Sequence, residues 1–402
     1  MHLSTALLLS LSIAHIATAV TYPIVDTAQA QAYDAAKAIE SPTAGERYYG
    51  QDAQYAGNAP AYQHNHDGTV SDQVTGLMWT QDPGAKKTYA AALAAAAKCR
   101  VGGYRDWRLP SIKELYSLIQ FNGTDPDPRA TSSRSLTPFI DTSYFNFEYG
   151  DTSKNERIID SQFASSTLYV STTMKGAKTD FGVNFADGRI KGYGLVDPRG
   201  REKTFYVLYV RGNPNYGVNQ YSDNLDGTIK DRATGLTWMQ ADSGESMDWP
   251  TALKYAEDMQ HAGYSDWRLP NAKELQSIID YTRSPDTTDS AAIDPLFKCT
   301  EIINEQGVKD YGNYWTSSTH VNTRGAAQAV YFSFGRSLGY MRDRFTGEGA
   351  WLDVHGAGSQ RSDPKVGDAS QFPQGRGPQG DAIRIQNMVR LVRGGEAVRV
   401  TQ

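Results

Sequence analysis

The chain has 402 residues, of which 21% are charged, and a formal net charge of −5. A net acidic chain has no electrostatic attraction for nucleic acid, so no nucleic-acid partner is expected. The mean hydropathy of −0.54 is typical of a polar globular protein, and the length is enough for two domains of common size.

The first residues predict an export signal. Residues 3–16 are almost all apolar, and Ala17-Thr18-Ala19 has the small-x-small pattern at which a signal peptidase cuts. The apolar run is too short to span a bilayer, and no later run has spanning length. We therefore expect a signal peptide over residues 1–19, no transmembrane segment, and an exported mature chain that is periplasmic, on the outer surface or extracellular.

Residues 20–62 precede a long internal repeat. Their alanine-rich part, residues 27–40, is compatible with a helix. After this segment the blocks around Asp67-Gly68-Thr69 and Trp107-Arg108-Leu109-Pro110 return at Asp226 and Trp267, 159 and 160 residues later. That period is too long for a solenoid repeat. It predicts two similar domains in tandem, over residues 63–213 and 214–402.

Each copy begins with a hairpin and continues with two helices. An Asp-Gly turn between short runs of β-formers marks the hairpin. The first helix is expected over residues 89–98 in one copy and after the N-cap Asp248 in the other. The second helix begins at a capping box in both copies, Ser111 with Glu114 and Asn271 with Glu274. Because capping explains the position of both glutamates, we interpret them as structural rather than catalytic.

The second half of each copy is predicted to be strands and loops. Each copy closes on an alternating strand, residues 206–212 and 388–394. The largest difference between the copies is residues 345–383, which are rich in Gly, Pro, Asp and Arg and have little periodicity. This stretch is expected to be an ordered functional loop or a mobile one. The fold class is therefore α+β, with mixed and mainly antiparallel sheets and long loops.

The repeated motifs resemble a known bacterial family. Asp-Gly-Thr, Thr-Gly-Leu-x-Trp, Trp-Arg-Leu-Pro-x-x-x-Glu-Leu, Trp-Thr-Ser-Ser and the final Val-Arg-Leu-Val-Arg-Gly are similar, in this order, to the domain family of unknown function numbered 1566, also called the C-terminal domain of the Legionella collagen-like adhesin. The resemblance implies two tandem C-type lectin-like domains. Its best-known member is an adhesin for sulfated polysaccharides, which implies that this protein binds a glycan or a cell-surface component.

Two features depart from the family pattern. Members often pair a Cys in the closing strand with one after the first helix, but here Leu208 or Tyr209 and Leu391 stand at the strand positions. The net acidic charge also differs from the basic face that sulfated chains require. The two cysteines, Cys99 and Cys299, lie in different copies. An exported protein with an even count favours a disulfide between them, and the alternative is two separate thiols.

The candidate ligand-binding residues lie in the second copy, in and just before the long stretch. Arginine binds sulfate or carboxylate groups, tryptophan stacks on sugar rings, and aspartate accepts hydrogen bonds from hydroxyls. The alternative is a loop whose charged groups pair with one another. The residues are Arg342, Arg344, Trp351, Asp353, His355, Arg361 and Asp363.

No cofactor is expected. Calcium is possible near the hairpins, but Asp223, Asp226 and Asp231 do not have the spacing of an EF-hand loop, and neither do His64, His66, Asp67 and Asp72. The run Gly375–Gly380 has the glycine spacing of a dinucleotide-binding fingerprint. It follows no strand and contains Pro378, so we interpret it as a loop. No hydrolase or redox motif occurs, so we expect no enzyme.

The sequence therefore predicts a non-catalytic, adhesin-like binding protein whose partner is a glycan or surface polysaccharide. The alternative is a structural or assembly module of the bacterial envelope that binds another protein. The oligomeric state is left open.

Overall fold

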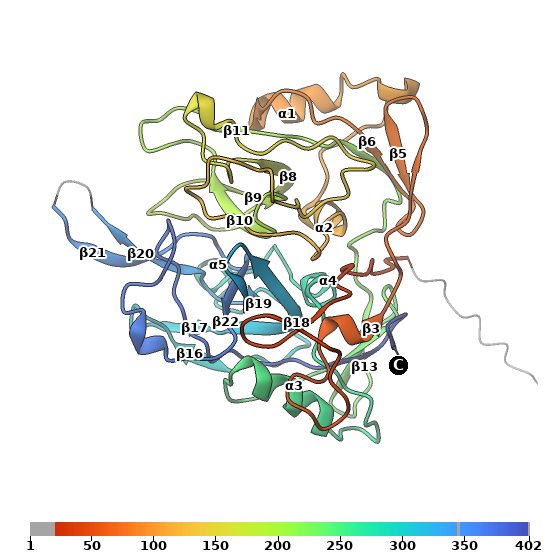
Figure 1. The fold of residues 1–402 in the computed structure, drawn as a ribbon, viewed down its shortest axis with the longest axis vertical. Helices are drawn as coiled ribbons and strands as arrows, with labels where there is room; N and C mark the ends of the chain where they lie inside the picture. The colour runs from red at the N-terminus through yellow and green to blue at the C-terminus, as the bar shows by residue number, and fades with distance from the viewer. Residues whose placement is uncertain (1–20, 344–345, 401–402) are drawn as a thin grey trace, which may run out of the picture.

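The computed structural model describes residues 21–343 and 346–400. Figure 1 shows two halves, one above the other, which correspond to the two sequence repeats. The predicted signal peptide over residues 1–19 lies outside the described residues.

The N-terminal segment packs mainly along the second unit (Figure 1). It contains β1 (Ala32–Tyr33), β2 (Ala38–Ile39), the short 3-10 helix η1 (Asp52–Gln54) and β3 (Tyr55–Ala56). Residues 27–40, whose composition is compatible with a helix, instead contain the two short strands β1 and β2. Asp34 Oδ1 accepts hydrogen bonds from the backbone N–H groups of Ala36 and Lys37, both at 2.7 Å, and this turn folds β2 back on β1. Side-chain bonding to the local backbone competes here with helix formation.

The two hairpins form matching four-stranded sheets. In both, the turn glycine has a positive φ, +84° at Gly68 and +85° at Gly227, which confirms the Asp-Gly prediction. The predicted closing strands are present but shorter than residues 206–212 and 388–394, and the structure shows that each adds to the hairpin sheet of its own unit. The first sheet has the order β12 (Val210–Gly212), β6 (Leu77–Thr80), β5 (Thr69–Asp72), β4 (Tyr62–His64), and the second β13 (Tyr221–Asp223), β14 (Thr228–Asp231), β15 (Leu236–Met239), β23 (Val392–Gly394).

The predicted helices are present in both units. The first are α1 (Tyr89–Ala96) and α3 (Trp249–Asp258), with Asp248 capping α3 through the N–H of Thr251. The second are α2 (Ile112–Ser117) and α4 (Ala272–Ser277), and each has its complete capping box. A further short helix, α5 (Pro285–Thr288), follows α4.

The structure shows a second partner for each capping glutamate. The arginine of the Trp-Arg-Leu-Pro motif binds it with both terminal nitrogens, at 2.6 and 2.5 Å for Arg108 on Glu114. In the second unit Arg268 binds Glu274 at 2.5 and 2.6 Å. The motif therefore anchors the chain before each second helix to the first turn of that helix.

A six-stranded antiparallel sheet runs across both units. Its order is β18 (Asn313–Asn322), β19 (Gly325–Ser333), β22 (Gln360–Pro364), β10 (Arg189–Gly194), β9 (Thr179–Asn184), β8 (Gln162–Leu168). Three strands come from each unit, and they join where Ile190 of β10 pairs with Gln360 of β22. We call this junction the seam.

The second unit departs from the first beside the seam. By sequence, the strand after Arg336 corresponds to β10, but it leaves the sheet as β20 (Leu338–Arg342) and pairs with β21 (Gly349–Asp353). This hairpin projects from the molecule in Figure 1. Strand β22 then takes the position beside β19. The stretch 345–383 therefore carries the ordered elements β21, β22 and η4 (Ala369–Gln371).

The remaining elements are short. They are β7 (Lys87–Thr88) paired with β11 (Thr204–Phe205), β16 (Glu301–Ile303) paired with β17 (Lys309–Tyr311), β24 (Val398–Arg399) paired with β3, and the 3-10 helices η2 (Val101–Gly103) and η3 (Thr152–Lys154).

The units share one core and exchange contacts between equivalent helices. The largest cluster of buried apolar side chains contains residues of both units, while smaller clusters lie under α1 and α3. Lys113 of α2 donates to the carbonyl of Ser277 at the end of α4, at 2.7 Å, and Lys273 of α4 donates to the carbonyl of Ser117 at the end of α2, at 2.9 Å. This reciprocal pattern is that of a two-fold interface within one chain.

Both cysteines are free thiols. Cys99 packs beside the cluster under α1, whereas Cys299 packs against the shared core, where its Sγ lies 3.3 Å from Arg390 Nη2. The disulfide that the sequence favoured is therefore not formed in the structure, which instead has the alternative of two separate thiols.

Candidate functional site

A pocket of about 380 Å³ opens at the seam and takes its walls from both units. The first unit contributes residues 125–129, Asp187, Arg189 and Lys191, and the second contributes residues 322–324, Gln328, Arg361 and Ser362. The turn over residues 376–381 completes the rim. Six cationic side chains and four carboxylates line the pocket, so its lining has an excess of positive charge.

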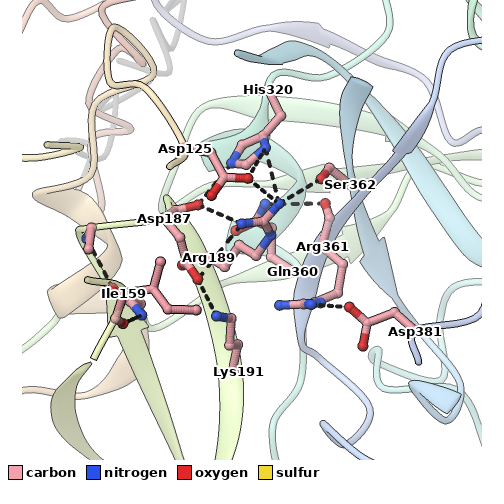
Figure 2. Close-up of polar contacts among 12 residues, drawn as sticks. Asp125, Ile159, Asp187, Arg189, Lys191, His320, Gln360, Arg361, Ser362 and Asp381 are labelled. Atoms are coloured by element: carbon pink, nitrogen blue, oxygen red, sulfur yellow. Dashed lines mark hydrogen bonds and ion pairs between the residues drawn. The ribbon is translucent and has the colours of Figure 1, made fainter. Parts of the chain in front are cut away.

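Arg189, on the first residue of β10, connects the two units. Its Nη2 donates to Asp125 Oδ2 at 2.8 Å and to Ser362 Oγ of β22 at 3.2 Å, and its Nη1 donates to the carbonyl of Asp187 at 3.0 Å. Figure 2 shows these contacts converging on the guanidinium. Burial opposes its charge, but Asp125 and Asp187 outweigh that effect, so the pKa of Arg189 is raised. A permanently charged group thus holds the seam together.

His320 of β18 packs behind Arg189. Its ring is fully buried, stacks on Phe139 with centroids 5.4 Å apart, and places Nε2 3.0 Å from the carbonyl of Asp187. Burial and the charge of Arg189 lower the pKa of His320 well below its usual value. The neutral imidazole therefore packs behind the pocket wall, with Nδ1 3.4 Å from Arg189 Nη2.

Lys191 lies two residues further along β10 and binds Asp187 Oδ2. Burial lowers the pKa of Lys191 to about 8, although Asp187 acts in the opposite direction. The positive charge of Arg361 also contributes to lowering the pKa of Lys191, and both side chains line the same pocket. The pocket wall therefore presents two neighbouring cationic groups, one from each unit.

Arg361 of β22 is held by Asp381, which lies across the pocket wall (Figure 2). The same carboxylate accepts from His355 Nε2, with 3.0 Å between His355 Nε2 and Asp381 Oδ1. Burial acts to raise the pKa of Asp381, but Arg361 and His355 hold it well below its usual value. Burial and Arg361 lower the pKa of His355 to about 4. Asp381 is thus ionised and His355 neutral near pH 7.

Several buried polar atoms of the pocket lack partners. Among residues 21–343 and 346–400, Nε and Nη1 of Arg361 have no hydrogen-bond partner, and neither does Oδ1 of Asp187. Arg361 is only 6% exposed and Asp187 1%. An unsatisfied buried polar group costs about 1–3 kcal/mol, so these atoms destabilise the wall unless water or another group supplies the missing hydrogen bonds.

The predicted ligand-binding residues are not gathered at one site. Arg361 lines the seam pocket, and His355 lies directly behind it. Arg342 and Trp351 lie on the β20–β21 hairpin, where the rings of Tyr340 and Trp351 meet edge to face at 5.4 Å. Arg344 lies outside the described residues.

Asp353 and Asp363, the two aspartates among the predicted ligand-binding residues, accept hydrogen bonds from backbone N–H groups. Asp353 Oδ1 accepts from the N–H groups of Ser337 and Gly356, at 3.2 and 2.9 Å, and burial raises its pKa to about 7. Asp363 Oδ2 accepts from the N–H groups of Arg384 and Ile385, at 3.1 and 3.0 Å, and burial raises its pKa to about 6. Both therefore stabilise turns beside the pockets.

The sequence reading missed the first unit's contribution to the pocket. Arg189 and Lys191 follow Asp187-Gly188 in the second half of the first copy, where the sequence predicted only strands and loops. The available signal was a strand that carries two cations beside an aspartate. The turn over Gly375–Gly380 is a loop, as predicted, and it places Arg376 and Gln379 at the pocket rim.

Trp351 lines a second hollow, of about 610 Å³, on the second unit. Its other walls include Ile302 and Ile303 of β16, Phe372 and Met388, and it has fewer charged side chains than the seam pocket. Arg384 lies in it with Nε and Nη2 on Glu305, at 2.8 and 2.9 Å.

The aspartates considered for calcium are used within their turns. Asp231 accepts hydrogen bonds from Asn219 and Thr234, at 2.7 and 2.9 Å, and Asp226 accepts from Thr228. Within the described part of the chain, no three His, Cys, Asp or Glu side chains are grouped as a metal site would require. Nor does that part contain a helix long and apolar enough to cross a membrane.

Comparison with known families decides the relationship that the motifs indicated. Residues 68–211 and 227–350 match the family described as the Lcl C-terminal domain, so two tandem copies cover more than half of the chain. The chain belongs to the Lcl C-terminal domain family. No curated protein and no solved structure matches it. The seam pocket of this Lcl-family protein lies between its two family domains, and parts of its wall, Arg361 to Ile383, come from residues beyond the second match.

Proposed function

We propose that this protein is an exported, non-catalytic, adhesin-like protein that binds a glycan or another surface component at the seam pocket. Membership of the Lcl C-terminal domain family supports a surface or secreted role. The single observation that carries the site is the pocket of about 380 Å³ at the seam, which Arg361 lines together with five other cationic side chains and four carboxylates. A C-type lectin-like arrangement of each unit belongs to the same proposal, because two helices and loop-rich sheets recur in both.

The pocket chemistry suits saccharides better than apolar ligands. Arginine forks bind carboxylates or sulfates, and the aspartates and Gln379 offer hydrogen bonds to hydroxyls. Repulsion between the cations is reduced because Arg189, Lys191 and Arg361 each pair with an aspartate. A site that contains both positively and negatively charged side chains suits a ligand that carries an anionic group and several hydroxyls.

One observation favours an assembly role as the second candidate. Ile303 is 72% exposed on the β16–β17 hairpin, and Val308 on the same hairpin is 44% exposed. Exposed apolar side chains that lie together mark protein interfaces more often than glycan sites. A partner protein of the envelope would dock there rather than at the seam.

A glycan array tests the proposal. The chain from residue 20 onward would be screened as wild type, as Arg361→Met and as Trp351→Ala, at low and at raised salt. We expect wild-type signals on anionic glycans that weaken with salt, disappear in Arg361→Met and remain in Trp351→Ala. An array without signals, together with a defined oligomer that Ile303→Asp dissolves, would move the function to assembly.

A further inference from the structure

We propose that this protein associates end to end with further copies of itself, through oppositely charged faces around α1 and α3. The α1 face consists of residues 83–105 and the α3 face of residues 243–265, which are equivalent stretches of the two units. Figure 1 shows the two helices at opposite ends of the long axis of the molecule. No residue that lines the seam pocket belongs to either face, so this inference is independent of the proposed glycan function.

The two faces carry opposite charge. The α1 face contains five cations and no acidic residue, whereas the α3 face contains four acidic residues and one lysine. Surfaces of opposite sign on one molecule attract each other between copies. The cations of the α1 face are Lys86, Lys87, Lys98, Arg100 and Arg105. The charged residues of the α3 face are Glu245, Asp248, Lys254, Glu257 and Asp258.

Ion pairs within the chain leave this contrast in place. Within the described part of the chain, four of the five cations of the α1 face have no ion-pair partner, and neither do two of the four acidic residues of the α3 face. Lys98, Arg105 and Glu245 are among these unpaired groups, and all three are exposed. The α1 face is therefore positive and the α3 face negative at its surface. The neutral pairs are Lys86 with Glu156 at 2.6 Å, Glu257 with Arg399 at 2.5 Å, and Asp258 with Lys254 at 2.6 Å.

The outer side of α1 is apolar and uncovered. Leu93 is 46% exposed, and four alanines of the same stretch are exposed beside it. In the second unit the N-terminal segment covers one side of the equivalent helix, where the rings of Tyr48 and Trp249 lie with centroids 6.1 Å apart. Because that segment packs along the second unit, the side of α1 is left for another molecule. The exposed alanines are Ala90, Ala91, Ala94 and Ala97.

The α3 end of the molecule also has exposed apolar side chains. Leu225, in the turn of the second hairpin, is 91% exposed, and Tyr264 is 43% exposed. That turn lies beside the residues that follow α3, since His261 Nε2 is 3.3 Å from the carbonyl of Gly227. In the proposed contact these side chains pack against Leu93 of the next copy, and the charged residues pair around them.

The difference between the faces determines the kind of assembly. A two-fold dimer built on either face would place like charges opposite one another, which is unfavourable. The contact therefore joins the α1 face of one copy to the α3 face of the next. Because the two faces lie at opposite ends of the molecule (Figure 1), each copy binds two neighbours, and the assembly grows until it closes into a ring or continues as a filament.

Sedimentation velocity on the chain from residue 20 onward tests the contact. At low salt we expect the mean size of wild type to increase with protein concentration, and raised salt should reverse this increase. The α1 variant combines Lys98→Glu with Arg105→Glu, and the α3 variant combines Glu245→Lys with Asp258→Lys. Each should lower the association constant about tenfold or more, because like charges then meet across the contact.

An equimolar mixture of the two variants is the decisive measurement. The unchanged α1 face of the α3 variant then meets the unchanged α3 face of the α1 variant, so association should return. The matched control, Arg134→Glu with Lys175→Glu, makes the same change of net charge at exposed positions outside both faces. Its association constant should stay within about twofold of wild type. Thermal unfolding of each variant reports on folding, and signals on the glycan array should not change.

The outcomes are distinct. Association that is lost in each folded variant and returns in their mixture supports the end-to-end contact. A wild type that remains a monomer at low salt overturns the inference, and so does association that either variant retains or a mixture of folded variants that stays monomeric. Each of these three results leaves the glycan function at the seam in place.

Discussion

The same arginine has different surroundings in the two units. Arg189 and Arg336 occupy matching positions after an Asp-Gly or Phe-Gly pair. Arg189 lies at the seam, with partners in both units. Arg336 binds Asp286 of α5, at 3.0 and 2.5 Å, and its other hydrogen-bond and ion-pair partners, Lys309 and Asp310, also belong to its own unit.

The strand that follows each arginine explains the difference. In the first unit β10 continues the sheet and offers its free edge to β22. In the second unit β20 turns outward into the hairpin with β21, and β22 fills the sheet instead. The insertion thus breaks the symmetry of the duplication at one edge. The seam pocket lies at that break, so the candidate binding site belongs to the pair of units rather than to either copy.

The largest expected effect is the loss of Arg189. Arg189→Met leaves Asp125 without its buried partner and removes the bridge to Ser362, so we expect the free energy of unfolding to fall by about 3–5 kcal/mol. Arg336→Met, whose main partner Asp286 is 34% exposed, should cost about 1 kcal/mol. Thermal and urea unfolding of both variants measure the difference. Equal losses of unfolding free energy in the two variants would mean that the contacts of Arg189 at the seam contribute no more to stability than those of Arg336.

The capping glutamates offer a second comparison between the units. Arg268 and Glu274 are 5% and 4% exposed, whereas Arg108 is 41% exposed. Arg268→Met should therefore destabilise the protein by about 3 kcal/mol, and Arg108→Met by about 1 kcal/mol, because water replaces a partner only at the exposed pair. Urea unfolding compares the two variants. A larger loss in Arg108→Met would contradict this account of the motif.

His355 predicts a pH dependence specific to the seam. Its pKa is about 4 in the folded protein and about 6.5 in an unfolded chain. The unfolded state therefore binds the proton more readily, and the stability due to neutral His355 is complete above pH 6.5 and decreases as the pH falls toward 4.

Between pH 6.5 and 5 we expect wild type to lose about 2 kcal/mol relative to His355→Asn. Comparison with the variant is needed because Asp353 and Asp363, whose pKa values are raised, change stability in the opposite direction. Melting temperatures of both proteins across this range provide the measurement. Parallel curves would show that His355 does not titrate as described.

The smallest expected effect concerns the projecting hairpin. Trp351→Ala removes the cross-strand contact with Tyr340 and should cost at most about 1 kcal/mol. Because Trp351 lies outside the seam pocket, ligand affinity should stay within twofold of wild type. Calorimetric titration with the ligand found on the array measures it, and a tenfold loss would place the site at the hairpin instead.

Local chemistry made much of the fold predictable. The Asp-Gly hairpins, the N-cap Asp248 and both capping boxes depend on residues within a few positions of one another, and all are present. Alanine content misled the reading of residues 27–40, where Asp34 forms a turn and Gln29 reaches the backbone of Phe121 and Thr319. Long-range hydrogen bonds override a weak helix propensity there.

The site was predictable only in part. Arg361 was selected because loops rich in arginine and aspartate often bind ligands, but its counterpart Asp187 is more than 170 residues away in the sequence. Pairing of β10 with β22 depends on the diversion of β20, and the sequence pattern of β20 matches that of an ordinary sheet strand. No local signal reports which of two similar strands stays in the sheet.

The most direct test of the composite site is the number of ligands bound per chain. Calorimetric titration with the glycan that gives the strongest array signal should yield one site per chain, abolished by Arg361→Met, since the seam occurs once. Two equivalent sites per chain, or one site that survives Arg361→Met, would contradict the account and return the binding function to the individual units.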